Sequence, residues 1–202
     1  MKIAGILLAA GAATRMGRNK LLVSLDGETL LRRAARRALA AGLDPVLVVV
    51  GHEAEKACAE IEGLGCRAVP NPDHASGINT SLSAGVDAVP ADSTAAVVLL
   101  ADMPWVSADM ISAVVARHAE TGAPVVTSRY GDTVAPPTLY ARSLLPELRG
   151  GAGEGRGRQV VRRHAKVAAV VDWPASALAD LDVPDDLERA RARLEGEVAD
   201  DR

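Results

Sequence analysis

The residues best suited to chemistry lie in a glycine-rich loop that runs from Leu8 to Lys20 and directly follows an apolar segment. Gly11 and Gly17 lack a Cβ atom and can adopt positive φ, so nearby backbone amides can turn toward an anion. Arg15 can clamp a phosphate through two parallel hydrogen bonds, whereas Lys20 supplies a point charge. This composition favours a phosphate-binding loop; the alternative is a tight turn with two solvated cations.

Two well-known phosphate-binding patterns are absent from this loop. The Walker pattern G-x-x-x-x-G-K-S/T does not fit, because five residues separate Gly11 from Gly17 and Arg18-Asn19 follows. The dinucleotide pattern G-x-G-x-x-G is also missing. The loop must therefore hold a phosphate, if it holds one, by a different arrangement.

The first candidate metal ligand is Asp102, which closely follows the apolar segment Ala95–Leu100. Pro104 limits continuation of a strand through this point. A carboxylate in this position can hold Mg²⁺, which bridges phosphate oxygens and offsets charge on a leaving group. An Asp in a turn is equally common for conformational reasons, so the residue types alone leave both interpretations open.

A second acidic cluster lies near the end of the chain. Asp180 and Asp182 precede Pro184, and Asp185 and Asp186 follow it. Proline and acidic residues are favoured in the first turn of a helix, which accounts for the two residues after the proline. Asp182 lies before the proline and is therefore free to reach a metal ion.

Short apolar segments alternate with longer segments of helical periodicity along the first half of the chain. This alternation predicts an α/β fold of three layers, with a Rossmann-like, mostly parallel sheet and helices on both faces. Such sheets bind ligands at the carboxyl ends of their strands, which directs attention to the loops after Leu8, Val50, Leu100 and Ser128. The predicted strands are Ile3–Leu8, Pro45–Val50, Arg67–Val69, Ala95–Leu100 and Pro124–Ser128, and the predicted helices are Thr29–Ala41, Glu53–Ile61, Ile78–Ala88 and Ala108–Glu120.

The second half of the chain is less regular. Val134–Tyr140 contains two consecutive prolines, which cannot donate to a sheet, so it is expected to be an edge strand at best. Gly150–Gly157 has five glycines in eight residues and is expected to be a flexible loop. Further expected elements are a helix at Gln159–His164, a strand at Lys166–Asp172 and a helix at Pro184–Glu195. We expect one domain over residues 1–196 and a frayed tail over 197–202.

Composition narrows the class of protein. Apolar residues make up 49% of the 202 residues, and the net charge of −3 gives no indication of a nucleic-acid-binding surface. Cys58 and Cys66 have neither a zinc nor a redox spacing, which is typical of reduced thiols in a cytoplasmic protein. The apolar stretch Ile3–Ala13 is shorter than the roughly 20 residues that a membrane span needs. We therefore expect a cytoplasmic protein with small-molecule partners and no membrane.

The string LAAGAATRMGRNKLL, from Leu8 to Leu22, resembles the signature of the MobA-like nucleotidyltransferases. The likeness is greatest to the branch that contains molybdenum cofactor cytidylyltransferase, and weaker landmarks extend to about Leu187. The resemblance implies a fold of the nucleotide-diphospho-sugar transferase type and a loop that wraps a nucleoside triphosphate. Ala10 is typical of the cytidylyl or adenylyl branch, whereas the guanylyl branch more often has glycine there, which favours CTP.

The resemblance also implies roles for individual residues. Asp102, in the stretch Asp102-Met103-Pro104, and Asp182, in a match where Val183 replaces a threonine, would be ligands of Mg²⁺, with Mn²⁺ as a second option. Arg15, Lys20 and Asp102 would be the catalytic residues. The residues implied to bind the nucleotide are Leu8, Ala9, Ala10, Gly11, Arg15, Lys20 and Ser81.

Three further landmarks are less decisive. The stretch Gly77–Leu82 resembles a family motif in which a helix start and Ser81 touch the nucleotide, although helix capping explains the same residues. Gly150–Arg158 resembles a family loop, and its basic residues could catch an anionic second substrate or simply be solvated. Ala135–Pro137 stands where the family often has Gly-His-Pro, so the identity of the second substrate stays open.

The reaction implied is nucleotidyl transfer from CTP to a molybdopterin-type acceptor, with pyrophosphate as the leaving group. An acceptor phosphate is already a nucleophile at neutral pH, so catalysis needs positioning and charge neutralisation more than a base. Accordingly, His52, His118 and His164 are expected at the surface. The alternatives are a transferase for another small phosphate or sugar phosphate and a non-catalytic nucleotide-binding maturation protein. A molybdoenzyme or its maturation chaperone is a candidate partner.

Overall fold

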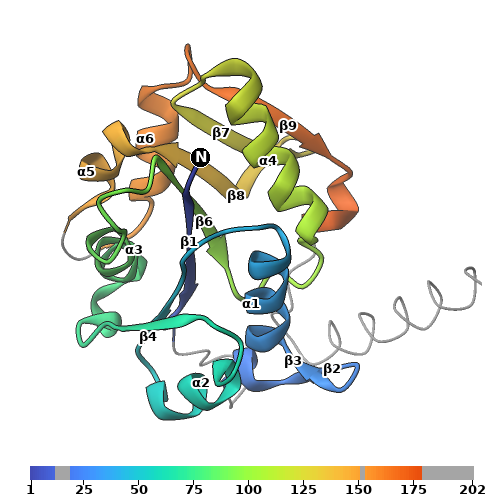
Figure 1. Ribbon diagram of the computed structural model, residues 1–202, viewed down its shortest axis with the longest axis vertical. Helices are drawn as coiled ribbons and strands as arrows, with labels where there is room; N and C mark the ends of the chain where they lie inside the picture. The colour runs from blue at the N-terminus through green and yellow to red at the C-terminus, as the bar shows by residue number, and fades with distance from the viewer. Residues whose placement is uncertain (12–18, 151–152, 179–202) are drawn as a thin grey trace, which may run out of the picture.

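A mostly parallel β-sheet organises the protein, as the computed structural model shows for residues 1–11, 19–150 and 153–178 (Figure 1). Within these residues the sheet has seven strands in the order β5-β4-β1-β6-β8-β7-β9. Only β8 runs antiparallel to its two neighbours. The strands are β1 (Ile3–Ala9), β4 (Val46–Val50), β5 (Arg67–Pro70), β6 (Ala95–Leu100), β7 (Val125–Tyr130), β8 (Thr133–Ala141) and β9 (Ala169–Trp173).

Helices cover both faces of the sheet, as the alternating pattern predicted. The helices on one face pack their apolar side chains against the odd-numbered positions of β1, such as Leu7, and those on the other face against the even-numbered positions, such as Ile6. The first set is α1 (Leu30–Ala40), α2 (Ala54–Ile61) and α4 (Ala108–Thr121), and the second is α3 (Ile78–Asp87), α5 (Leu145–Leu148) and α6 (Arg156–Arg163). The three-layer α/β fold expected from the sequence is therefore confirmed.

Strand β8 contradicts the prediction of an edge strand, because it lies between β6 and β7. Both prolines fall outside the paired residues: β6 pairs with Thr138–Ala141, and β7 pairs with Thr138 and then with Ala135 across a register shift. Their carbonyls are used instead. The Ser128 hydroxyl donates to the Pro137 carbonyl at 2.9 Å, and the Tyr130 hydroxyl donates to the Pro136 carbonyl at 2.8 Å. An irregular pairing thus accommodates residues that cannot donate to the ladder.

Several short elements were not predicted from the sequence. The 3₁₀ turn η2 (Lys20–Leu22) leads into the hairpin of β2 (Ser24–Leu25) and β3 (Glu28–Thr29). In and beside this hairpin, the buried residues Val23, Leu25 and Leu30 form a small cluster of their own. Three more 3₁₀ turns are η3 (His74–Ser76), η4 (Arg142–Leu144) and η5 (Ala175–Leu178). None of these stretches is long enough to show a periodicity.

The region after Gly150 also departs from the prediction. Helix α6 begins at Arg156 rather than Gln159, so the last two residues of the expected loop, Arg156 and Gly157, are helical. The last strand is Ala169–Trp173, shifted toward the C-terminus from the predicted range. The predicted helix Pro184–Glu195 lies outside the described residues. Among the helices that are described, none has both the length and the apolar character needed to cross a membrane.

Candidate active site

The carboxyl ends of β1, β4 and β6 meet at one edge of the sheet, and main-chain hydrogen bonds join the loops that follow them. The Ala101 N–H donates to the Leu8 carbonyl, and the His52 N–H donates to the Ala10 carbonyl, each at 3.2 Å. Leu8, Ala9 and Ala10 are buried. The start of the glycine-rich loop is therefore held in place by the neighbouring strands, at the edge where such sheets bind ligands.

Gly11 is the last residue described before the rest of this loop. It is exposed, and a Cβ atom built on it would meet no other atom within 4 Å. The sequence allowed a positive φ at Gly11, but Gly11 does not adopt one, so the chain leaves β1 without a left-handed turn at this position. It thus borders open space beside the strand ends. Arg15 and Gly17 lie outside the described residues.

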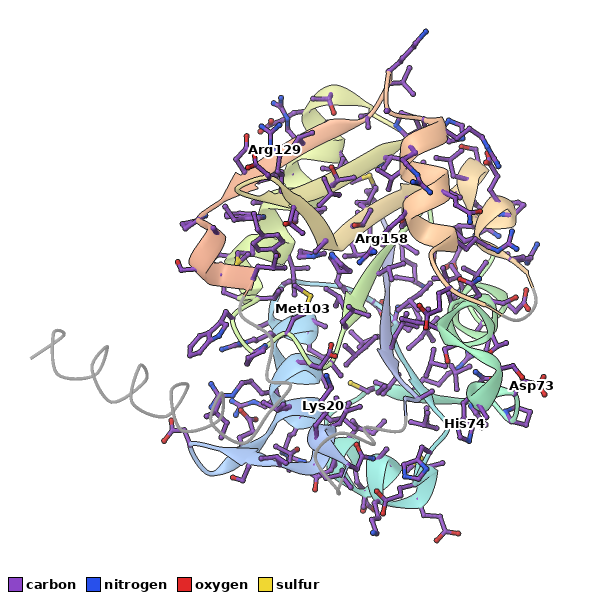
Figure 2. All side chains as sticks on the ribbon, turned by 180° about the vertical axis from the view of Figure 1, so that it is seen from behind. Lys20, Asp73, His74, Met103, Arg129 and Arg158 are labelled. Carbon is purple, nitrogen blue, oxygen red and sulfur yellow. The ribbon has the colours of Figure 1, made fainter. Side chains whose placement is uncertain are left out.

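Lys20 and Asp102 form an ion pair that joins the loop after β1 to the loop after β6. The Lys20 Nζ atom lies 2.8 Å from Asp102 Oδ2, and the side chains are 18% and 29% exposed. Figure 2 shows Lys20 near the end of β6. A phosphate or a metal ion can therefore approach this pair from solvent. The structure brings together two residues that lie far apart in the chain, since β4, β5 and β6 come between them.

The local structure fixes the position of Lys20. Asn19 is only 6% exposed, and its Oδ1 atom accepts a hydrogen bond from the Leu21 N–H at 3.2 Å. Asn19 is thus the N-cap of η2, which begins at Lys20. A buried cap next to the cation limits where the cation can go.

Arg37 of α1 fixes the segment that follows Asp102. Its Nη1 atom donates to the carbonyls of Pro104 and Val106, the latter at 3.1 Å. The residue types of α1 do not predict these two hydrogen bonds, since an arginine on a helix is usually solvated. Burial lowers the pKa of the Arg37 guanidinium below its usual range, yet an arginine stays protonated at neutral pH.

Asp102 is the carboxylate at this edge that pairs with Lys20, and a carboxylate of this kind suits a hard cation. They contain no group of three or more His, Cys, Asp or Glu side chains that could hold a metal ion. Mg²⁺ commonly keeps several waters and binds through one or two carboxylates together with substrate phosphates. Asp102 fits that requirement because its carboxylate is accessible and carries a cation partner of the kind that also binds phosphate. Asp180 and Asp182 lie outside the described residues.

Ser81 lies in the first turn of α3 and is only 5% exposed. Its hydroxyl accepts a hydrogen bond at 2.9 Å from Nδ2 of Asn71, which also donates to the Thr80 hydroxyl at 3.0 Å. Asn71 follows β5 and is 4% exposed. The structure therefore gives Ser81 a partner within the protein, and Asn71, which the sequence analysis missed, ties the helix start to the sheet edge.

A cavity of about 650 Å³ opens beside this edge, on the face of the sheet that carries α3 and α6. Leu8 and Leu100, which are direct neighbours in the sheet, contribute to its floor, so it adjoins the loops of Gly11 and Asp102. Its walls are largely aliphatic. Three arginines of α6 also line it, namely Arg156, Arg158 and Arg162.

In Figure 2 Arg158 lies between α6 and the strands β6 and β8. Of the two interpretations that the sequence left open for the region around Arg158, the cavity agrees with the substrate-binding one. No ion pair is found for the three α6 arginines within the part of the chain that the structure describes. Guanidinium groups that line a cavity can bind an anion, although Glu154 lines this cavity as well.

The histidines behave as structural residues. His118 Nδ1 lies 2.8 Å from the Ala123 carbonyl at the end of α4, and His164 Nε2 lies 2.9 Å from Glu147 Oε1. The side chain of His52 is 44% exposed. His52 Nε2 lies 3.9 Å from Glu53 Oε2, so each of the three has a neighbouring group within the protein. None of the three lines the cavity.

Comparison with known proteins shows the family to which the chain belongs. Residues 5–167 match the model of the MobA-like NTP transferase domain. The purine catabolism protein PucB of Bacillus subtilis is 31% identical over 94% of this chain and 96% of its own length. The molybdenum cofactor guanylyltransferase of Rhodobacter capsulatus is 29% identical over 96% of this chain and 97% of its own length.

Solved structures agree with the fold. The crystal structure of Rv0371c from Mycobacterium tuberculosis matches with a TM-score of 0.84 and 25% identity over 95% of this chain and 98% of that one. A complex of Rv0371C with manganese gives a TM-score of 0.80 at 24% identity, over 95% of this chain and 99% of that one.

The fold and the sheet-edge site, together with these likenesses, define a nucleotidyltransferase with a three-layer α/β fold. The chain belongs to the MobA-like NTP transferase family. The family resemblance identified from the glycine-rich loop is thereby confirmed, and the narrower assignment to a cytidylyltransferase branch stays a prediction.

Proposed function

We propose that this protein transfers a nucleoside monophosphate, CMP from CTP, to a phosphorylated acceptor of the molybdopterin type. The observation that carries the proposal is the accessible Lys20–Asp102 pair at the carboxyl edge of the sheet. It combines a cation for phosphate with a carboxylate for Mg²⁺, at the place where a parallel sheet binds its ligands.

In this proposal the acceptor phosphate oxygen attacks the α-phosphorus in line, and the bond to the β-phosphate oxygen breaks, so pyrophosphate leaves. Lys20 and Arg15 hold the phosphates and offset the negative charge that develops on them. The backbone from Leu8 to Gly11 approaches the base and ribose. No general base is required, because the acceptor phosphate is ionised at neutral pH.

Asp102, together with Asp182, would hold the divalent cation, Mg²⁺ or Mn²⁺. When bound, such an ion would offset the negative charge that develops on the phosphates. The Lys20 ammonium beside Asp102 balances the carboxylate in the protein alone. Ser81 stays a candidate nucleotide contact, and its bond to Asn71 suggests that it also orients the first turn of α3.

The cavity beneath α6 is the proposed acceptor site. Its arginines suit a phosphate, and its aliphatic walls suit an acceptor with a sizeable apolar body. The polar edge of a pterin and the hydroxyl groups of a sugar phosphate, the first alternative, both need hydrogen bonds. The choice of a molybdopterin-type acceptor therefore rests on the family resemblance. Ala10 in place of glycine favours CTP over GTP.

A pyrophosphate-release assay tests the proposal with CTP, GTP and ATP in turn, with Mg²⁺ and with molybdopterin as the acceptor. We expect release that depends on both the acceptor and the metal, with CTP as the best donor. Turnover with a sugar phosphate but not with molybdopterin would move the function to the first alternative. Nucleotide binding by thermal shift without any turnover would favour the binding-only alternative.

A further inference from the structure

The start of α3 and the segment before α6 bind each other through main-chain and side-chain groups, although they are far apart in sequence. The Asn79 N–H donates to the Gly153 carbonyl at 3.1 Å, and the Gly153 N–H donates to the Ser76 carbonyl at 2.9 Å. The Arg156 N–H donates to Asn79 Oδ1 at 3.1 Å. Figure 1 shows α3 and α6 on the same side of the sheet.

The contact between the two backbones is very close. A Cβ atom on Gly77 would lie 2.6 Å from the Gly153 carbonyl oxygen, and Gly77 has a φ of 109°. Any larger residue at position 77 would therefore force the two segments apart. The two glycines allow Asn79 to reach the first turn of α6.

Asn79 performs the function of an N-cap for a helix to which it does not belong. The residue at the N-cap position of α6 is Gly155, which has no side chain and makes no capping hydrogen bond. The first amides of a helix have no partner within it. Asn79 Oδ1 accepts from one of them, at Arg156, and Asn79 is only 5% exposed.

The helix that Asn79 caps carries the charged rim of the cavity. Arg156 begins the helix, and Arg158 and Arg162 line the cavity with it. A second contact holds the same turn from below, since the Tyr140 hydroxyl donates to the Gly157 carbonyl at 3.2 Å. The position of the arginines therefore depends on how the first turn of α6 is held.

We propose that Asn79 is a positioning residue that holds α6 and thereby places its arginines over the acceptor. The assignment of these arginines to the acceptor rests on the proposed function, whereas the capping role does not. Asn71 and Ser81 tie the same turn of α3 to the end of β5. The nucleotide edge of the sheet and the acceptor cavity are thus connected through one buried turn.

Amide hydrogen exchange of the free protein tests the capping role, in the peptide that spans residues 153–163. Asn79→Leu keeps the shape of the side chain and removes the acceptor oxygen. We expect exchange in that peptide to accelerate about five- to tenfold, the loss typical of an N-cap. Asn79→Asp keeps an acceptor at a helix N-terminus, where negative charge is favourable, and should stay within about twofold of the native rate.

The matched control is Ser107→Ala, which removes the N-cap of α4, where the Ser107 hydroxyl accepts from the Met110 N–H. It should accelerate exchange in α4 and leave residues 153–163 unchanged. Unchanged exchange in 153–163 for Asn79→Leu overturns the capping role. Equal acceleration there by Ser107→Ala also overturns it, because the effect would then be global.

Steady-state kinetics with molybdopterin and CTP test the consequence for the acceptor. Asn79→Leu should raise the acceptor KM about tenfold and leave the CTP KM within about twofold of the native value. Asn79→Asp should have the native acceptor KM. An equal rise in both KM values overturns the assignment to the acceptor side. If the native protein shows no turnover, the proposed function fails, while the exchange result still decides whether Asn79 holds α6.

Discussion

Two regions of the sheet supply the proposed site by different means. On the side formed by β5, β4, β1 and β6, the strands are all parallel, and the candidate residues lie in loops at their carboxyl ends. Next to β6, the antiparallel strand β8 with its two prolines is inserted, and the cavity lies against β6 and β8 beneath α6, with Leu8 of β1 also in its lining. The nucleotide side therefore depends on regular topology, whereas the acceptor side depends on particular contacts.

This difference suggests that the chemistry and the choice of acceptor can vary separately. Lys20 and Asp102 would serve any acceptor phosphate. In the proposed function, Arg158 and the aliphatic walls would select among acceptors, because they would contact the body of the acceptor. Variants on the two sides should then change different kinetic constants.

Asp102→Asn should have the largest effect, because it removes a charge at the reacting phosphates and leaves Lys20 without its carboxylate partner. We expect a fall in kcat of about 10²–10³-fold, comparable to the loss of one preorganised electrostatic contact. The measurement is pyrophosphate release at saturating substrates. Near-native kcat in a folded Asp102→Asn variant would remove Asp102 from the site.

Arg158→Ala should act on the acceptor side only. We expect the acceptor KM to rise about tenfold and the CTP KM to stay within about twofold, since uniform binding is lost while the nucleotide contacts stay. Arg129→Ala is the matched control, because Arg129 is an exposed arginine of β7 that pairs with Asp172 at 3.0 Å and does not line the cavity. A larger effect of the control would break the proposed division.

Tyr130→Phe tests whether the irregular pairing of β8 depends on side-chain hydrogen bonds. Tyr130 is 1% exposed, and its hydroxyl donates to the Pro136 carbonyl at 2.8 Å. Removing it should lower the free energy of unfolding by about 0.5–1.5 kcal/mol, because a partly buried hydrogen bond is lost. Urea denaturation measures this. A loss below the measurement error would mean that the strand is held by packing alone.

Glu147 should contribute the smallest effect, and one that depends on pH. Hydrogen bonds from His164 first and Arg163 second hold the pKa of Glu147 below its usual 4.5. A carboxylate with a depressed pKa in the folded state stabilises above its unfolded value and loses that contribution as pH falls.

The test compares the Tm of the native protein with that of Glu147→Gln. The variant should have a slightly lower Tm at about pH 7, and the difference should shrink as pH falls through the depressed pKa of the folded-state carboxyl. The effect should be small because exposed ion pairs contribute little. A difference that grows on acidification would contradict the sign of the pKa shift.

The parallel side of the fold was largely predictable from the sequence. Ala95–Leu100 was predicted with its observed bounds, and Thr29 caps α1 at the predicted start of that helix. Buried parallel strands are continuous apolar runs, which are visible in a sequence. Asp102 was found for the same reason, since it comes just after such a run.

The acceptor side was not predictable in the same way. Two prolines indicated an edge strand, but the register shift beside Ser128 lets them lie inside the sheet. Five glycines indicated a loop up to Gly157, but Asn79 caps a helix from Arg156. In each case a partner distant in sequence supplies a hydrogen bond that local residue types cannot reveal.

By itself the sequence determined the family, the order of the elements and the carboxylate and cations from which a phosphate site is made. These properties depend on local residue types and on apolar periodicity, which need no knowledge of distant contacts. Tertiary structure alone decided that Lys20 lies against Asp102, that Arg37 holds the segment after it, and that Asn79 caps α6. Those contacts join residues far apart in the chain, so their geometry exists only once the sheet has brought the strand ends together.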